Sequence, residues 1–127
     1  MLVDTSVWID HFRRDRPDLR ARLEAGDVVS HPFVIGELAC GTIRRRDDVL
    51  ALLSTLPQVA VASHDEVLRL LDRHHLMGQG LGWVDAHLLA SALLARDTLW
   101  TLDRSLARAA QALGVRLPGS LWTLSDR

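Results

Sequence analysis

The feature that most constrains the fold is the alternation, along the chain, of short apolar runs with longer segments of helical periodicity. Strands are expected at residues 1–4, 27–31, 58–62, 98–102 and 115–117. Helices are expected at residues 5–14, 17–26, 32–43, 47–56, 64–78, 83–97 and 103–114. Strands that alternate with helices of about 10–15 residues are typical of a parallel sheet covered by helices on both faces. The pattern therefore predicts an α/β fold.

Local signals mark several helix ends. Thr5 is expected to cap the first helix. Ser63, followed three residues later by Glu66, forms the pattern of a capping box. Three glycines within residues 78–82 predict a loop, which leads into the most regular helical segment, residues 83–97.

The length of 127 residues and the hydrophobic content of 48% predict one folded domain over residues 1–127. No run approaches the ~18 apolar residues of a membrane span, and the first residues lack the pattern of a signal peptide. The single cysteine, Cys40, cannot form an internal disulfide, which fits a reducing cytoplasm. The basic residues, all 15 of them arginine, nearly balance 16 acidic residues, so composition leaves the function open.

Two acidic residues stand at the expected carboxyl ends of strands. Asp4 follows Leu2 and Val3, and Asp103 follows residues 98–102. Each acid alone can be explained as the cap of the helix that follows it. In parallel α/β sheets, however, ligands bind beyond the carboxyl ends of the strands, so both acids are candidates for one site.

Two further acidic residues are expected on apolar helix faces. The positions three, four and seven residues after Asp85 are apolar, and the helical neighbours of Glu37 include no basic residue. A carboxylate turned toward an apolar interior must be protonated, hydrogen-bonded or bound to a metal, because burial of its charge is costly. The positive end of its helix would stabilise Asp85, whereas Glu37 lies in mid-helix and lacks that explanation.

The four acids together indicate a metal site formed by Asp4, Glu37, Asp85 and Asp103. An acidic cluster without an accompanying cysteine or histidine pattern favours Mg²⁺ or Mn²⁺ over zinc. Such a cation can activate water and stabilise the charge that develops on a phosphate under attack. Hydrolysis of a phosphodiester is the chemistry that this set most naturally implies.

Four stretches carry a resemblance to a known family: "MLVDTSVWID", "GEL" around Glu37, "GQGLGWVDAHLLASALL" around Asp85 and "LWTLDRSLARAA" around Asp103. Together they resemble a PIN domain and, more specifically, a VapC-type ribonuclease toxin of a bacterial toxin–antitoxin pair. The resemblance extends from Met1 to about Leu117. It implies a three-layer α/β/α sandwich with a central, mostly parallel sheet, and Mg²⁺- or Mn²⁺-dependent cleavage of RNA by an endonuclease.

The resemblance also implies roles for individual residues. Asp4, Glu37, Asp85 and Asp103 match the acidic quartet of the family, and Asp4 and Asp85 match its positions most directly tied to metal. Ser6 or Thr5 matches the small hydroxyl residue that supports the first acid. The family further implies a cognate antitoxin that blocks the site, a homodimer and a cytoplasmic location.

Other conspicuous residues are expected to be structural. His74 is placed on the apolar face of helix 64–78, and Cys40 is expected to be a small buried residue. The remaining histidines of interest, His11, His31 and His87, are treated as isolated or structural. Core packing is the expected role of the tryptophans Trp8, Trp83 and Trp100, while Trp122 is a candidate for packing on a partner chain. Trp8 and Trp83 each lie within a few residues of a site acid, so stacking on a nucleobase is the alternative role for these two. For the arginine groups 13–16 and 44–46, solvent-exposed cations and contacts with an RNA backbone both remain open.

Two other functions compete with a metal-dependent endoribonuclease. The first is a non-catalytic PIN-like module that binds RNA or protein. The second is a phosphatase-like hydrolase with Asp4 as its nucleophile. A second acid often follows closely in that chemistry, whereas Thr5 and Ser6 follow Asp4 here.

Overall fold

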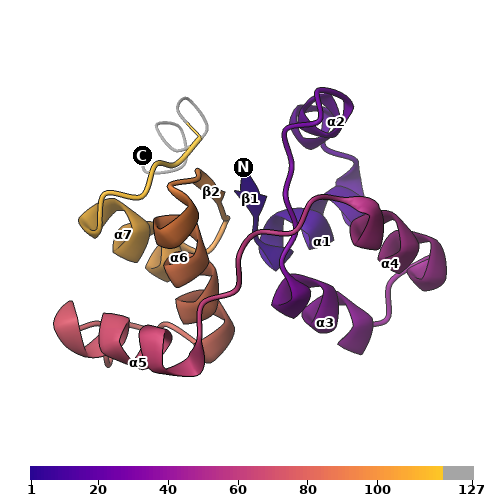
Figure 1. The fold of residues 1–127 in the computed structure, drawn as a ribbon. Helices are drawn as coiled ribbons and strands as arrows, with labels where there is room; N and C mark the ends of the chain where they lie inside the picture. Colours follow the sequence, from indigo (N-terminus) through magenta and orange to yellow (C-terminus); the bar gives the residue numbers. More distant parts are fainter. Residues whose placement is uncertain (119–127) are drawn as a thin grey trace.

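The computed structural model describes residues 1–118, in which helices lie on two sides of a small parallel sheet (Figure 1). On one side of the strands lie α1, α2, α3 and α4, and on the other lie α5, α6 and α7 (Figure 1). In chain order the elements are β1 (Leu2–Val3), α1 (Thr5–Arg14), α2 (Pro17–Glu24), α3 (Pro32–Cys40), α4 (Arg46–Thr55), α5 (His64–Arg73), α6 (Trp83–Ala95), β2 (Leu99–Trp100) and α7 (Arg104–Ala112).

The sheet brings the start of the chain beside residues nearly a hundred positions later. Strands β1 and β2 are parallel, with Leu2 opposite Leu99 and Val3 opposite Trp100. On its other side, Leu2 forms a parallel bridge with Val29. Strand β1 therefore has a neighbour on both sides, which places Asp4 at the carboxyl end of a central strand.

The regular sheet is smaller than the sequence predicts. Within the described residues, segments 27–31 and 58–62 contribute only isolated bridges, including Ser30 with Gln58. Segment 115–117 is not a strand, although the Leu99 N–H donates to the Arg116 carbonyl at 2.9 Å. The parallel α/β character is thus present, while the full three-layer sandwich stays a prediction.

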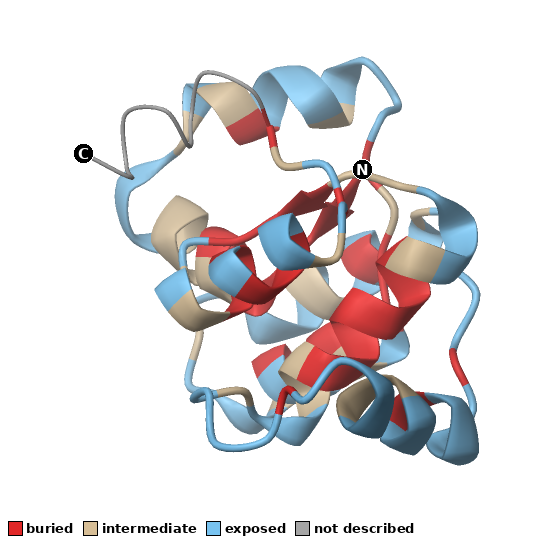
Figure 2. Cartoon of the chain, turned by 90° about the vertical axis from the view of Figure 1, so that its left-hand side faces the viewer, coloured by how far each residue is buried: buried red, intermediate tan, exposed pale blue. Residues whose placement is uncertain are grey.

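The core consists mainly of the strands and the helices packed against them (Figure 2). Trp8 and Trp100 are fully buried in it, as predicted. In α6, residues 86–92 are all buried, which agrees with the nearly continuous apolar sequence of this helix. No helix within residues 1–118 combines the length and apolarity that a membrane crossing requires. Trp122 lies outside the described residues.

Helix α5 ends five residues earlier than predicted, and this changes the place of His74. His75 adopts a left-handed backbone conformation with φ of 52°, and the Leu76 N–H donates to the Leu71 carbonyl at 3.0 Å. These features are typical of a Schellman motif. Leu76 then occupies the buried position, so His74 is exposed and its predicted core location is wrong.

Candidate active site

Asp4 lies at the tip of β1, and its side chain is held by hydroxyl groups. Its Oδ2 accepts hydrogen bonds from Ser6 Oγ and from Thr101 Oγ1, both at 2.7 Å. The residue is 5% exposed. Asp4 occupies the N-cap position of α1 but makes no side-chain capping bond. The capping explanation therefore does not account for Asp4, whose carboxylate is oriented by Ser6 and Thr101 instead.

Thr5 does not cap α1, contrary to the prediction, because it is the first residue of the helix itself. Its hydroxyl donates to Glu37 Oε1 at 2.6 Å and thereby joins α1 to α3. Glu37 is exposed rather than turned into the core, because α3 buries Val34 and Leu38 and leaves Glu37 beside that face. The expectation of an inward-facing Glu37 is wrong, yet its carboxylate is positioned next to the Asp4 segment.

Asp85 lies in the first turn of α6, where its Oδ2 accepts from the Gly82 N–H at 3.0 Å. Burial raises the pKa of this carboxyl, and so do the negative charges of Asp4, Asp103 and Glu37, while the Gly82 hydrogen bond opposes them. The negative charges of the other three acids therefore act on the carboxyl of Asp85.

Asp103 follows β2 and caps α7. Its Oδ1 accepts from the Leu106 N–H at 3.0 Å, while its own N–H donates to Thr101 Oγ1 at 3.0 Å. Thr101 thus contacts two members of the quartet, Asp4 through its hydroxyl hydrogen and Asp103 through its oxygen. The capping explanation for Asp103 is correct, and it leaves the second carboxylate oxygen available.

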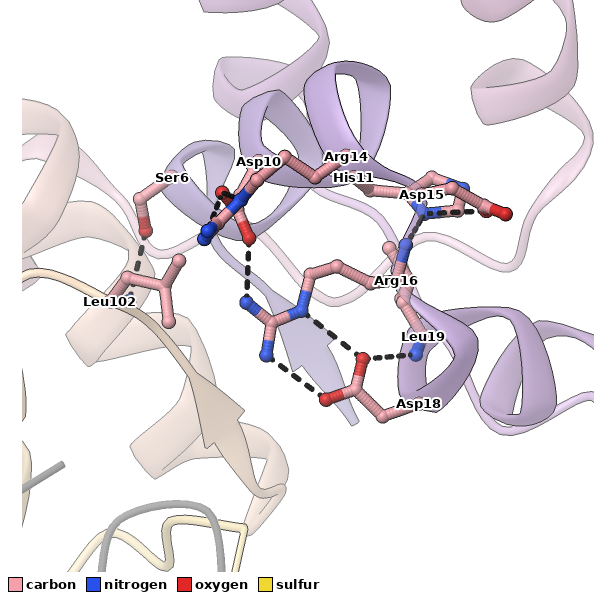
Figure 3. Close-up of polar contacts among 9 residues, drawn as sticks. All are labelled: Ser6, Asp10, His11, Arg14, Asp15, Arg16, Asp18, Leu19 and Leu102. Carbon is pink, nitrogen blue, oxygen red and sulfur yellow. Dashed lines mark hydrogen bonds and ion pairs between the residues drawn. The ribbon is translucent and has the colours of Figure 1, made fainter. Parts of the chain in front are cut away.

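The four carboxylates share one arrangement: each has one oxygen held by a hydrogen-bond donor of the protein. For the other oxygen, the structure records no hydrogen bond or ion pair within residues 1–118. Acids elsewhere differ, since Asp10 pairs with Arg14 and Arg16, and Asp18 pairs with Arg16 (Figure 3). The quartet therefore presents oriented, negatively charged oxygens without an arginine to neutralise them.

This donor set fits a hard divalent cation. Mg²⁺ prefers oxygen ligands and keeps several waters, so it needs only one or two carboxylates directly. Within residues 1–118, no three His, Cys, Asp or Glu side chains converge as a ready-made ligand cage. The arrangement suits a hydrated cation held by few side chains better than zinc, which takes a closed set of nitrogen and sulfur ligands.

Several structural expectations outside the quartet were wrong. Cys40 is exposed, and Trp83 keeps 38% of its surface accessible. His31 and His87 are not isolated, because their ring centroids lie 6.3 Å apart. His11 has the predicted structural role, since its Nδ1 accepts from the Arg16 N–H at 2.9 Å (Figure 3).

The arginine groups divide between structural roles and exposed positions. Arg14 and Arg16 form ion pairs with acidic residues of α1 and α2. Arg46 begins α4 and donates from Nε to the Ala39 carbonyl in the last turn of α3, at 3.0 Å. A carbonyl at a helix C-terminus is a favourable partner for a cation, so this arginine joins α3 to α4.

Sequence reasoning missed Thr101 and the aromatic group around His87. Thr101 stands two residues before Asp103, and a hydroxyl at that strand end was the available signal. The rings of Phe33 and Trp83 lie 4.4 and 4.9 Å from that of His87. Periodicity could not reveal this group because its members come from two helices far apart in the chain.

Comparison with known proteins gives a match to a family model and matches to curated proteins. A model of the PIN domain family matches residues 1–112. Two curated proteins, both named Ribonuclease VapC32 and from two strains of Mycobacterium tuberculosis, are each 51% identical to this chain over 118 residues. The alignment covers 92% of this chain and 95% of each relative.

Proposed function

Because the chain belongs to the PIN domain family, we propose that it hydrolyses RNA phosphodiester bonds with a divalent cation held at Asp4, Glu37, Asp85 and Asp103. The chain is a ribonuclease of the VapC type, an assignment that rests on relatives of that name aligned along nearly its whole length. The observation that carries the proposed site is the quartet of carboxylates that are oriented by protein donors but have no cationic partner within residues 1–118.

Asp4 and Asp85 are the proposed direct ligands of Mg²⁺ or Mn²⁺. Both are partly or wholly removed from solvent, and each keeps an oxygen without a protein partner. A bound cation would lower the pKa of a water and stabilise the charge on the phosphate. The raised pKa of Asp85 supports this role, because burial and, to a smaller extent, the neighbouring acids make its charged form unfavourable, and a divalent cation would offset both effects.

The remaining groups orient and complete the site. Ser6 and Thr101 fix Asp4 through Oδ2, and Thr5 fixes Glu37 through Oε1. Glu37 and Asp103 would help to hold the hydrated cation in the proposed site. None of these acids has to remove a proton itself, because water on the cation is already acidified.

The proposal includes a wider biological setting. We infer a cognate antitoxin that blocks the acidic pocket, a homodimer, a cytoplasmic location and a single domain over residues 1–127. The three-layer α/β/α sandwich belongs to the same proposal and is supported by helices on both sides of the strands (Figure 1).

The first test of the site is RNA cleavage by the Asp4→Asn and Asp85→Asn variants in Mg²⁺ or Mn²⁺. Both variants are expected to lose detectable cleavage, because a neutral amide neither binds a hard cation strongly nor offsets its charge. EDTA should likewise abolish cleavage by the unmodified protein. Circular dichroism and thermal unfolding establish whether each variant stays folded.

Asp47→Asn is the matched control, since the Asp47 side chain is 98% exposed on α4. This variant should cleave RNA as the unmodified protein does. Full activity in Asp4→Asn or Asp85→Asn would contradict the site. A folded, unmodified protein that cleaves no RNA with either cation would favour the non-catalytic binding module, and a trapped aspartyl-phosphate would favour the phosphatase-like alternative.

A further inference from the structure

Trp83 is an exposed aromatic residue close in the chain to Asp85, one of the proposed site acids. It is the first residue of α6, two positions before Asp85, and 38% of its surface is accessible. Trp8 and Trp100, by contrast, are 0% and 1% exposed. An exposed indole in the first turn of a largely buried helix needs an explanation other than core packing.

The indole is held in place by neighbouring rings. The His87 ring, one helical turn along α6, meets Trp83 edge-to-face at 4.9 Å between centroids. The His64 ring, at the start of α5, lies 5.1 Å from Trp83 on a tilted plane. Beneath them, Phe33 of α3 contacts His87 at 4.4 Å. These contacts orient the indole before any ligand arrives, which reduces the entropy lost on binding.

The ring group borders the proposed cation site on two helices. On α3, Phe33 and Glu37 are four residues apart and share a face. On α6, Trp83 and Asp85 occupy the same first turn but point to different sides, since residues two apart do not share a face. Trp83 therefore lies in the same helical turn as Asp85 without being placed as a ligand.

We propose that Trp83 is a stacking platform for one unpaired nucleobase of the RNA next to the bond that is cut. This inference rests on the proposed nuclease function and assigns to it a residue for substrate positioning. Each base has a π-face, so stacking on an aromatic ring binds single-stranded RNA with little dependence on sequence. The chemical class recognised is an extruded base of single-stranded RNA.

Electrostatics favour a base as the occupant of this surface. The proposed site, to which Asp85 belongs, has four carboxylates with no arginine partner recorded in the described residues, so it repels the phosphates of RNA. A cation offsets only part of that repulsion. A neutral base stacked at the rim adds attraction that does not depend on charge. The carboxylates of an acidic peptide would be repelled by the four acids in the same way, so such a peptide is disfavoured.

The test measures RNA binding by Trp83→Leu and Trp83→Phe in EDTA, where cleavage does not occur. The probe is a short single-stranded oligoadenylate with a fluorescent label, followed by anisotropy. Trp83→Leu should weaken binding roughly 5- to 100-fold, the range expected from loss of one base–aromatic stack. Trp83→Phe, which retains an aromatic ring, should recover part of that loss.

A second probe separates stacking from a general change in shape. Oligoadenylate that carries one abasic residue at each position in turn should bind the unmodified protein weakly at one position. The same abasic probe should cause no further loss in Trp83→Leu. During catalysis, Trp83→Leu should raise KM with little change in kcat, because the side chain does not contact the reacting atoms.

Leu68→Ala is the matched control, because Leu68 is an apolar residue of α5 with similar exposure, 42%. It should bind oligoadenylate as the unmodified protein does. If folded Trp83→Leu bound oligoadenylate as tightly as the unmodified protein, the stacking role of Trp83 would be overturned. The same conclusion would hold if that variant lost affinity only for a protein partner. The Asp4→Asn cleavage assay reports separately on the nuclease site, so failures of the two proposals are distinguishable.

Discussion

Thr101 shows how a single hydroxyl can organise a site assembled from distant parts of the chain. It donates to Asp4 Oδ2 and accepts from the Asp103 N–H. Groups that orient metal ligands typically change metal affinity or activity by about 10- to 100-fold when they are removed. Thr101 is therefore expected to matter for activity although it is not itself a proposed ligand.

We predict that Thr101→Val reduces Mg²⁺-dependent RNA cleavage roughly 10- to 100-fold. Valine keeps the shape of threonine but offers neither the donor nor the acceptor, so Asp4 loses part of its orientation. Cleavage rates measured over a range of Mg²⁺ concentrations should show a weaker apparent affinity for the cation. Thr98→Val, three residues earlier and outside this network, serves as the control, and an equal effect of the two substitutions would contradict the role of Thr101.

At the residue scale, sequence reasoning identified the acids but not their supports. Asp4 and Asp103 were predictable because each follows an apolar strand-like run. Glu37 was selected for an apolar environment that α3 does not provide, since the residue is exposed. The link from Thr101 to Asp4 depends on the pairing of β1 with β2, and local periodicity contains no information on which strands pair.

At the scale of elements, the loop 78–82 controls where α6 begins relative to α7. Gly80 has φ of +81°, and a Cβ placed on it would lie 2.8 Å from Ser105 Oγ on α7. Asp85 stands near the start of α6 and Asp103 immediately before α7. The close approach of the loop to Ser105 therefore helps to set the separation of two proposed site acids.

We predict that Gly80→Ala destabilises the protein by about 2–3 kcal/mol, from left-handed backbone strain together with the steric conflict at Ser105. Thermal or urea unfolding measures the loss. Gly78→Ala is the control, because Gly78 has φ of +75° but no atom within 4 Å of the added Cβ, and it should cost only about 1–2 kcal/mol. Adding Ser105→Ala to Gly80→Ala should remove the part of the stability loss by which Gly80→Ala exceeds Gly78→Ala. Equal losses for the two alanine variants would show that Ser105 is not a constraint.

The helices were largely predictable because apolar periodicity and capping residues are local signals. Ser63 and Glu66 form the predicted capping box, and α6 begins at the predicted residue. The end of α5 was not predictable from periodicity, because the reversal at His75 depends on burial of Leu76 by tertiary packing. The strands were overestimated for a related reason: an apolar run predicts burial, whereas regular pairing requires a partner of matching length.

At the scale of the whole molecule, histidines lie where the α1–α4 side meets the α5–α7 side. His31, at the N-cap of α3, is fully buried, and its ring lies 6.3 Å from that of His87 on α6. Burial, with a smaller contribution from His87, lowers the pKa of His31 from 6.5 to about 4. The pKa of His87 is lowered in the same direction by burial and by His64.

We predict that acid weakens the fold between pH 6.5 and pH 4. In this range the unfolded state binds the proton of His31 and the folded state does not, so the free energy of unfolding falls as the pH falls. At pH 4, the His31 effect has lowered the free energy of unfolding by about 3 kcal/mol. Asp85 acts in the opposite direction, because its raised pKa means that the folded state takes up its proton first.

The measurement is urea unfolding across that pH range for the unmodified protein and for His31→Asn. Asparagine can replace the side-chain acceptor that His31 Nδ1 offers to the Phe33 N–H, but it does not titrate. The variant should be less stable at neutral pH, because the smaller side chain leaves a cavity, yet its stability should depend less on pH. An unchanged slope would contradict the assignment to His31.

The pairing of β1 with β2 also means that the proposed site needs residues from both ends of the described chain. Asp4 is synthesised before its partner Thr101, which follows 97 positions later. Parallel pairing across such a distance forms late, because the long intervening chain must first be brought together. A growing chain that lacks β2 and α7 has neither the orienting hydroxyl nor Asp103.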